Sequence, residues 1–385
     1  MAGLRGWIIL AAIALARIGF GYQFQTVASL GPVLMRRFGL DYAGLGTLIG
    51  LYMAAGVVIA LPLGLLARQV GDRLVLGGGL ALMALGGFVP ALGGVEGIAA
   101  GRVLAGIGAV AMTVLQSKVI ADWFPGRRFM LAVSVSVGAY PVGIGLSQLT
   151  APPLASAYGW PAAFLAGGAE MAAAMGLFLA SFRPAPAAPA ARGGFHLPGR
   201  RECWLLIAAG LIWTAYTAGY AGFLSYAPSL MAVRGEGLVI TGVVMALATW
   251  GNVAGTLAGG ALAGRYGGWP VFAAGTVIMT VGIAAMGVVD WPIALGAIIG
   301  IPGSIQPGVI VAVGTLSARP ENRAAGMGIF YTTYYAGGAV VPALCGRAAD
   351  AWGGPAGAMY AAALVSALAL PIYVLHRRLA AGVDA

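Results

Sequence analysis

The chain has 385 residues, of which 60% are hydrophobic and 8% are charged, and its formal net charge is +10. With a mean hydropathy of +0.92, this composition excludes an ordinary water-soluble domain and indicates an integral membrane protein. The positive charge does not indicate nucleic-acid binding, because 20 of the 21 basic residues are arginines spread singly or in pairs between apolar stretches.

Apolar stretches long enough to span a membrane follow one another along the whole chain. A helix needs about 20 such residues to cross a hydrocarbon core of about 30 Å, and it satisfies its own backbone hydrogen bonds there. We therefore predict an all-α integral membrane protein with twelve transmembrane helices. The predicted spans cover residues 7–31, 41–66, 74–93, 96–121, 129–154, 160–182, 203–231, 238–263, 269–288, 291–317, 324–350 and 355–377.

The polar run from residue 183 to residue 201 is the one long interruption between these spans. It carries four arginines and no acidic residue, and its prolines, alanines and glycines favour irregular backbone. We expect a cytosolic linker over residues 183–202, which joins an N-terminal six-helix bundle over residues 1–182 to a C-terminal six-helix bundle over residues 203–385.

Basic residues are distributed unequally between the two sides of the membrane. If both termini are cytosolic, fourteen basic residues fall inside, and only Arg36, Arg37 and Arg234 fall outside. This is the bias of the positive-inside rule. We predict a multi-pass protein of the bacterial inner membrane with both termini in the cytosol. We expect the first span to be retained and not cleaved as a signal peptide, because Arg17 interrupts its apolar core.

Arg17 lies about ten residues into the first span, which places it near the middle of the membrane at about 1.5 Å per residue. A charge at that depth costs at least about 2.5 to 3.5 kcal/mol, so it should face the bundle interior or a water-filled cavity. We interpret Arg17 as a cation that faces a substrate. The alternative is a structural cation that a carboxylate or backbone carbonyls neutralise.

A glycine-rich run occurs twice, as GLLARQVGDR after the second span and as GGALAGRYGG after the eighth. Its positions recur at an offset of 196 residues, which Arg127 and Arg323 share. Such an offset indicates a duplicated six-span unit, a parallel repeat of the kind found in transporters. The matching positions are Gly64, Leu66, Ala67 and Gly71 in the first copy and Gly260, Leu262, Ala263 and Gly267 in the second.

These runs resemble the signature of the major facilitator superfamily, Gly-x-Leu-Ala-Asp-Arg-x-Gly-Arg between spans two and three. The chain departs from it at Arg68, where the family has aspartate, and Asp72 stands four residues further on. An arginine early in span four and the glycines and proline of span five also match. The resemblance implies two pseudo-symmetric bundles and a conformational latch at Gly64, Gly71, Asp72, Arg73, Arg102, Gly138, Pro141, Gly260 and Gly267.

A narrower resemblance, of the runs KVIADWFPGRR and SVSVGAYPVGIGLS, is to the cyanate-permease-like branch of small-anion transporters. The superfamily resemblance implies that spans one, four, seven and ten line a central cavity that opens alternately to each side. Polar residues on these spans and their neighbours are then candidate substrate ligands. They are Arg17, Gln23, Tyr52, Gln116, Lys118, Tyr140, Tyr216, Tyr220, Asn252, Gln306, Tyr331 and Tyr335.

Structural roles remain open for several of these candidates. Lys118, the one lysine of the chain, stands four residues before Asp122 and is within reach of an intrahelical ion pair. The tyrosines also suit an aromatic core in which their hydroxyls bond to neighbouring helices. Glu170, a carboxylate in the middle of span six, is either a proton site or the partner of an arginine.

The implied cavity holds the cation Arg17, with Lys118 as a possible second one, and no facing carboxylate. A desolvated positive site stabilises an anion and opposes a cation. We predict a secondary active transporter that moves a small organic or inorganic anion, monocarboxylates first, and works as a monomer in the lipid bilayer. The alternatives are an exporter of drugs or neutral metabolites on the same fold and, more remotely, a membrane sensor that transports nothing.

No enzyme chemistry is predicted. The sequence has no Gly-x-x-x-x-Gly-Lys-Ser/Thr run for a nucleotide. Its two cysteines and two histidines do not form a metal cluster, and the histidines lie outside the membrane core. We expect no cofactor, no metal and no nucleic-acid partner, and we leave open anion exchange, uniport and symport with a proton that the substrate carries.

Overall fold

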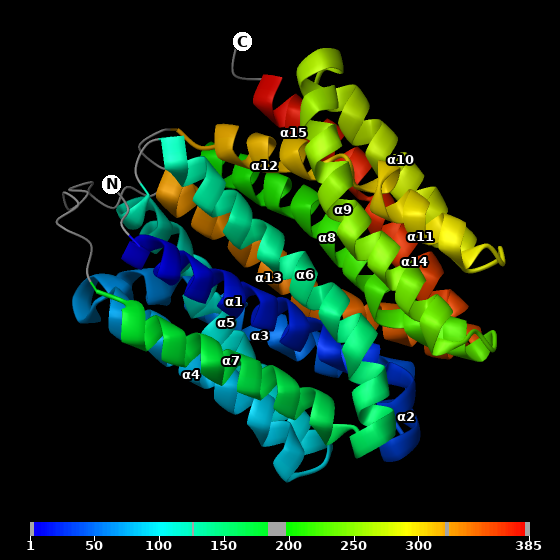
Figure 1. Cartoon of the computed structure of the whole chain (residues 1–385). Helices are drawn as coiled ribbons and strands as arrows, with labels where there is room; N and C mark the ends of the chain where they lie inside the picture. The colour runs from blue at the N-terminus through cyan, green and yellow to red at the C-terminus, as the bar shows by residue number, and fades with distance from the viewer. Residues whose placement is uncertain (1–3, 125–126, 184–197, 320–322, 382–385) are drawn as a thin grey trace. The chain divides into compact units, whose positions relative to one another are not determined.

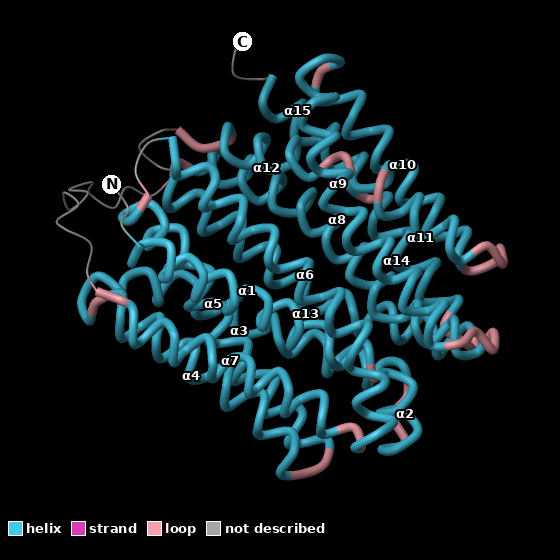
Figure 2. The backbone as a smooth tube through the Cα atoms, viewed as in Figure 1, coloured by secondary structure: helices cyan, strands magenta, loops and turns pink. Residues whose placement is uncertain are grey.

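The computed structural model describes residues 4–124, 127–183, 198–319 and 323–381, and within them the chain is helical with no strand (Figures 1 and 2). Among the described residues, eleven helical segments are long and apolar enough to cross a membrane. The remaining predicted span corresponds to α13, a helix of 30 residues that is not one of the eleven. The prediction of an all-α membrane protein is confirmed.

The first six predicted spans correspond to α1 and α3 to α7, and α2 is a short additional helix. Their bounds are α1 Leu4–Ser29, α2 Gly31–Phe38, α3 Tyr42–Val70, α4 Asp72–Phe88, followed by the 3-10 turn η1 Val89–Leu92, α5 Val95–Trp123, α6 Arg127–Tyr158 and α7 Pro161–Ser181. The second half contains α8 Arg200–Val233, α9 Leu238–Tyr266, α10 Gly268–Met286, α11 Pro292–Gly300, η2 Pro302–Ser304, α12 Pro307–Leu316, α13 Arg323–Trp352, α14 Ala356–Ala367 and α15 Ala369–Ala381.

The tenth and twelfth predicted spans are each broken into two helices. In the tenth, α11 ends at Gly300, and the turn η2 separates it from α12. Pro302 and Pro307 stand at the starts of η2 and α12, where their missing N–H groups cost no hydrogen bond. In the twelfth, Pro371 cannot donate to the carbonyl of Ala367, the last residue of α14.

The helices divide into two compact units. The first contains Met1–Phe38 and Leu51–Ala191, and the second contains Gly39–Gly50 and Arg192–Ala385. The division after residue 191 lies in the predicted linker, of which residues 184–197 are outside the described part of the chain. The start of α3 belongs by its contacts to the second unit, whereas the predicted boundary assigns all of residues 1–182 to the first.

Backbone conformation repeats between the two halves. Among the described residues, positive φ angles occur only at glycines. Gly71 and Gly267, which are 196 residues apart, both have φ of 89° and precede α4 and α10. Gly39 and Gly235, also 196 apart, have φ of 65° and 77°. The predicted duplication therefore reappears as equivalent turns between equivalent helices.

Replacing Gly71 or Gly267 by alanine should lower the melting temperature of the detergent-purified protein. The expected cost is about 1 to 3 kcal/mol each, because a Cβ disfavours positive φ. The space around Gly71 is open, so the cost is conformational rather than steric. Gly78→Ala is the matched control, because Gly78 is helical with nothing near its missing Cβ, and this change should be neutral or stabilising. Equal melting temperatures for Gly71→Ala and Gly78→Ala would contradict the prediction.

Within the first unit, the backbones of α1 and α6 approach each other closely. A Cβ on Gly21 would overlap the carbonyl of Tyr140, and one on Gly143 would overlap the carbonyl of Ile18. Two glycines thus let the helix backbones touch, a common device where small residues lie between membrane helices. The contact places the middle of α1, with Arg17, beside Tyr140 on α6.

Candidate functional site

Arg17 lies next to two aromatic rings within the first unit. Its guanidinium carbon lies 5.3 Å from the centroid of Phe20 and 5.1 Å from that of Tyr140, which are cation–π distances. The side chain is half-buried. Predicted candidates Arg17 and Tyr140 therefore lie together, and the aromatic faces stabilise a cation without neutralising its charge.

Phe20 joins this group to Tyr52 and was missed by the sequence analysis. The rings of Phe20 and Tyr52 stack with centroids 5.7 Å apart and planes 13° apart. Phe20 stands three residues after Arg17, so the helical i, i+3 spacing was the signal that could have identified it. We call Arg17, Phe20, Tyr52 and Tyr140 the Arg17 cluster.

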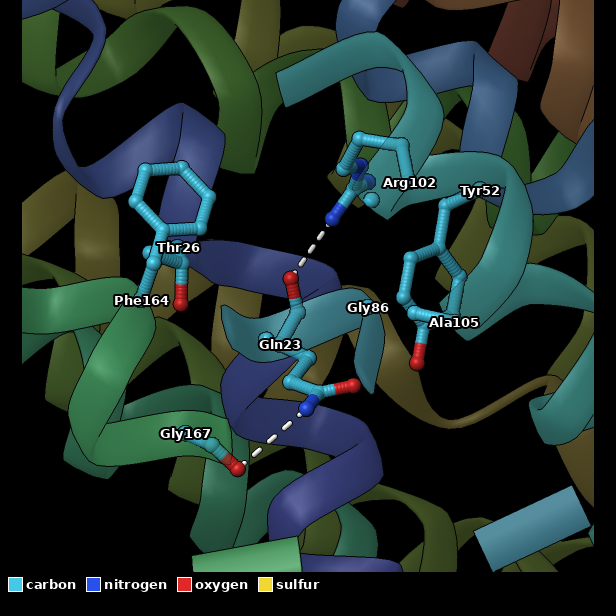
Figure 3. A pocket seen from close by; sticks show the side chains of 10 residues that line it. Gln23, Thr26, Tyr52, Gly86, Arg102, Ala105, Phe164 and Gly167 are labelled. Carbon is cyan, nitrogen blue, oxygen red and sulfur yellow. Dashed lines mark hydrogen bonds between the residues drawn. The ribbon is translucent and has the colours of Figure 1, made fainter. Parts of the chain in front are cut away.

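Arg102 is buried next to this cluster, with 3% of its surface exposed. Its Nη1 donates to the carbonyl oxygens of Gln23, at 2.6 Å, and Phe24, at 3.2 Å. Its guanidinium carbon lies 4.4 Å from the ring centroid of Tyr52 (Figure 3). Arg102, predicted as part of a conformational latch, thus anchors α5 to α1.

Gln23, a predicted substrate ligand, takes part in the same packing. Its Nε2 donates to the carbonyls of Met83, at 2.9 Å, and Gly167, at 3.2 Å, so that α1 is tied to α4 and α7 (Figure 3). The cavity that Gln23 and Arg102 line has a volume of about 10 Å³. This is about the space of one water molecule, so in this conformation the cavity cannot hold an organic substrate.

Lys118 forms an ion pair between helices rather than along its own helix. Its Nζ donates to both carboxylate oxygens of Asp72, at 2.8 and 2.6 Å. The Lys118 side chain is 55% exposed. Partial burial raises the pKa of the Asp122 carboxyl, while nearby Lys118 acts to lower it. The predicted substrate ligand Lys118 therefore joins the predicted latch residue Asp72.

The remaining candidates on α4 and α5 bond to neighbouring helices, and the remaining latch positions lie within helices. Arg73 donates to the carbonyl of Leu179 at 3.1 Å. Gln116, on α5, accepts a hydrogen bond of 3.0 Å from Ser136 on α6. Among the latch positions, Gly138 and Pro141 lie within α6, and Gly260 lies in α9. Gly64 lies in α3, within the stretch 61–69 whose side chains are outside the described part.

A second polar cluster lies within the second unit at the break in the tenth span. Asn252 donates from Nδ2 to the hydroxyl of Tyr216, at 2.8 Å, and to that of Ser304, at 2.9 Å. Ser304 in turn donates to the carbonyl of Ile299, at 3.0 Å. The broken helix frees backbone groups inside a membrane span, and within this cluster the Ser304 hydroxyl bonds to a backbone carbonyl at the break. Ser304 was missed, although the neighbouring Pro302 signals a discontinuity.

The other candidates of the second unit have different surroundings. The rings of Tyr216 and Tyr220 are parallel, with centroids 6.5 Å apart, and Tyr220 donates to the carbonyl of Ala248 at 2.9 Å. Gln306 is 1% exposed, and its Oε1 has no hydrogen-bond partner. Tyr331 and Tyr335 both lie near Tyr334, with ring centroids 6.5 and 5.3 Å from it. Tyr331 is 37% exposed, whereas Tyr335 is buried.

The first turn of α3 is held by α13 and α8, all within the second unit. The carboxylate of Asp350 accepts the backbone N–H groups of Tyr42, at 3.0 Å, and Ala43, at 2.9 Å. The hydroxyl of Tyr226 lies 2.9 Å from the carbonyl oxygen of Tyr42 and 2.7 Å from that of Pro342. Asp350 thus caps a helix that is distant in sequence, a role that no local pattern predicts.

Replacing Asp350 by alanine should loosen the start of α3. Loss of a helix cap costs about 0.5 to 2 kcal/mol, so amide hydrogen exchange within residues 39–50 should accelerate by roughly 2- to 30-fold. Peptide-resolved exchange measured by mass spectrometry tests this. Asp290→Ala is the control, because the Asp290 side chain is 76% exposed and its ion pair with Arg234 is long, at 3.9 Å. Unchanged exchange of this segment in Asp350→Ala would refute the capping role.

Within the described residues, no group of three or more histidine, cysteine, aspartate or glutamate side chains could hold a metal ion. Cys203 and Cys345 are both free thiols, and Cys345 is buried. The first unit therefore contains a cation flanked by aromatic rings, and the second contains a cluster of uncharged hydrogen-bonding groups.

The fold and these sites define a polytopic helical membrane protein built from a repeated unit. The family model of the Major Facilitator Superfamily matches residues 13–342 and 241–382. The chain belongs to this superfamily, and its family and fold are those of transporters rather than of enzymes.

Two similar proteins illustrate this membership. The hexuronate transporter of Escherichia coli K12 is 29% identical over 177 residues, which are 43% of this chain and 39% of that protein. The gallate transporter of Pseudomonas putida is 27% identical over 169 residues, which are 42% of this chain and 36% of that protein. The chain thus matches less than half the length of either relative.

The fold itself matches over almost the whole chain. A solved structure of a bacterial homolog of the human lysosomal transporter Spinster superposes with a TM-score of 0.79 at 18% identity, covering 96% of each chain.

Proposed function

We propose that this protein is a secondary active transporter that moves an organic anion across the bacterial inner membrane by alternating access. The observation that carries the proposal is Arg17, a half-buried cation in the middle of a membrane-spanning helix with two aromatic rings as neighbours. A guanidinium binds a carboxylate in bidentate geometry, which makes this group a natural anion ligand.

A carboxylate is the substrate group that this site favours. Aromatic faces around a cation lower its access to water and strengthen its attraction for a bound anion. Hexuronate and gallate, which name the relatives' substrates, are both carboxylates with hydroxyl groups. We assign carboxylate binding to Arg17 of the first unit.

The transporter works as a monomer with both termini in the cytosol in this proposal. The excess of arginines in the loops predicted to be cytosolic supports the orientation. The division of the contacts near residue 191 supports a linker between two bundles.

Proteoliposomes that contain the purified protein test the substrate class. We expect counterflow of radiolabelled glucuronate, gallate or a simple monocarboxylate, and none of glucose or tetraethylammonium. Thermal stabilisation by the same anions in detergent is the parallel measurement. Counterflow of the cation or the neutral sugar without any anion would favour the exporter interpretation and refute anion transport.

A further inference from the structure

Glu170 is a buried carboxyl that the proposed site does not use. It lies in the middle of α7, inside a membrane-spanning segment. Both of its side-chain oxygens are buried, and neither has a hydrogen-bond partner. Its carboxyl lies directly against Gly19 of α1, because a Cβ on Gly19 would overlap Oε2. A carboxylate charge in such a contact would cost several kcal/mol.

The helices packed against α7 bring little compensating charge to Glu170. Among their described side chains, α1 carries Arg5, Arg17 and Tyr22, α6 carries Tyr140 and Tyr158, α4 carries Asp72 and Arg73, and η1 has no titratable group. Arg5 is 14 residues from Gly19 along α1. On α4, Gly87 packs against Gly168 of α7, and Asp72 and Arg73 are at least 14 residues from Gly87. Each of these charges is therefore roughly 15 Å or more from the level of Glu170 along its helix.

The side chain of Arg17 and the position of Gly19, which contacts Glu170, point in different directions from α1. Gly19 follows Arg17 by two residues, which turns its position by about 200° around α1. The guanidinium of Arg17 lies against Phe20 and Tyr140, whereas Gly19 meets α7. The anion ligand and the buried carboxyl therefore lie on opposite faces of the same helix.

We propose that Glu170 is the proton-binding site that couples anion transport to a proton gradient, an inference that rests on the proposed function. In the arrangement described here Glu170 carries the proton as a neutral carboxylic acid. On release its O–H bond breaks, the proton passes to water, and the carboxylate remains. The carboxylate must leave its dry contact with Gly19, so α1 and α7 separate. Because α1 also carries Arg17, proton release and anion release act on one helix.

The transport test compares wild type with Glu170→Gln, which keeps the shape of the neutral acid. For one proton per monoanion, an imposed gradient of about one pH unit drives about tenfold accumulation of glucuronate or gallate in wild type. Glu170→Gln should show no accumulation above equilibrium while it retains counterflow exchange. Glu96→Gln, at an exposed position in the first turn of α5, is the matched control and should behave as wild type.

Gradient-driven accumulation by Glu170→Gln equal to that of wild type would overturn the proposal. Loss of both accumulation and counterflow in Glu170→Gln, with a wild-type melting temperature, would also overturn it, because the residue would then serve anion movement itself. If Glu170→Gln fails to fold, Glu170→Asp replaces it, and an unaltered pH dependence of uptake there would count against Glu170.

A measurement without substrate separates this inference from the proposed function. Infrared spectra of the purified protein at neutral pH should contain a carboxylic acid C=O band that Glu170→Gln lacks and Glu96→Gln retains. An identical band in Glu170→Gln would refute the protonated site. A wild-type protein that transports no tested anion would refute the coupling together with the proposed function, while the infrared band still decides whether Glu170 holds a proton.

Discussion

Exchanging Arg17 for glutamine should nearly abolish carboxylate transport while leaving membrane expression unchanged. Removal of one partner from a desolvated charge pair costs about 2 to 5 kcal/mol, so the affinity for the anion should fall by roughly 30-fold or more. The rings of Phe20 and Tyr140 make cation–π contacts with the guanidinium of Arg17, and a neutral glutamine cannot form them. Counterflow in proteoliposomes and anion-induced thermal stabilisation both measure this loss.

Two further variants identify the cause of the Arg17 effect. Arg17→Lys keeps the charge but loses the planar bidentate fork, so we expect partial activity with weakened affinity. Arg36→Gln, at an exposed position near the end of α2, removes one positive charge from the same half of the chain and should transport normally. Normal transport by Arg17→Gln would show that the cation is structural and would remove the basis for an anion substrate.

Replacing Arg102 by alanine should cause a large loss of stability. The side chain is 3% exposed, and it donates charged hydrogen bonds to the carbonyls of Gln23 and Phe24. Each such bond contributes about 1.5 to 3 kcal/mol, and the substitution also removes the contact with Tyr52 and leaves a cavity. The melting temperature in detergent should fall far below that of wild type.

The comparison with Arg73 makes the Arg102 prediction specific. Arg73→Ala also removes a guanidinium bond to a backbone carbonyl, that of Leu179, but this bond is exposed, so water replaces it and the expected loss is about 1 kcal/mol or less. Equal melting temperatures for Arg102→Ala and Arg73→Ala would contradict the role of Arg102 as the buried anchor of α5.

Local sequence patterns predicted the helices well because membrane insertion imposes a length and a composition on each span. The predicted second span, 41–66, became α3 from Tyr42 to Val70, and the predicted sixth, 160–182, became α7 from Pro161 to Ser181. Continuity within a span was harder to predict. Both broken spans contain prolines, but α6 continues through Pro141, Pro152 and Pro153. The presence of a proline therefore does not by itself predict a break.

Depth in the membrane limits which partners a charged side chain can have, and this limit guided the choice of Arg17 as a candidate. A charge in mid-span must find a polar or aromatic partner, and Arg17 does so at Tyr140, which was itself a candidate. Prediction was less informative for Gln23 and Lys118. Amides and amines near helix ends have several partners within reach, and only packing selects among them.

The sequence by itself determined that this chain is a helical membrane protein made of a repeated unit, because hydrophobic length, arginine distribution and the offset of 196 residues are one-dimensional properties. The tertiary structure decided which polar groups meet. Asp350 caps α3 from about 300 residues away, and Glu170 meets Gly19 across two helices. Such partners depend on how helices rotate and approach one another, and that follows from the packing of many small residues together rather than from any single local pattern.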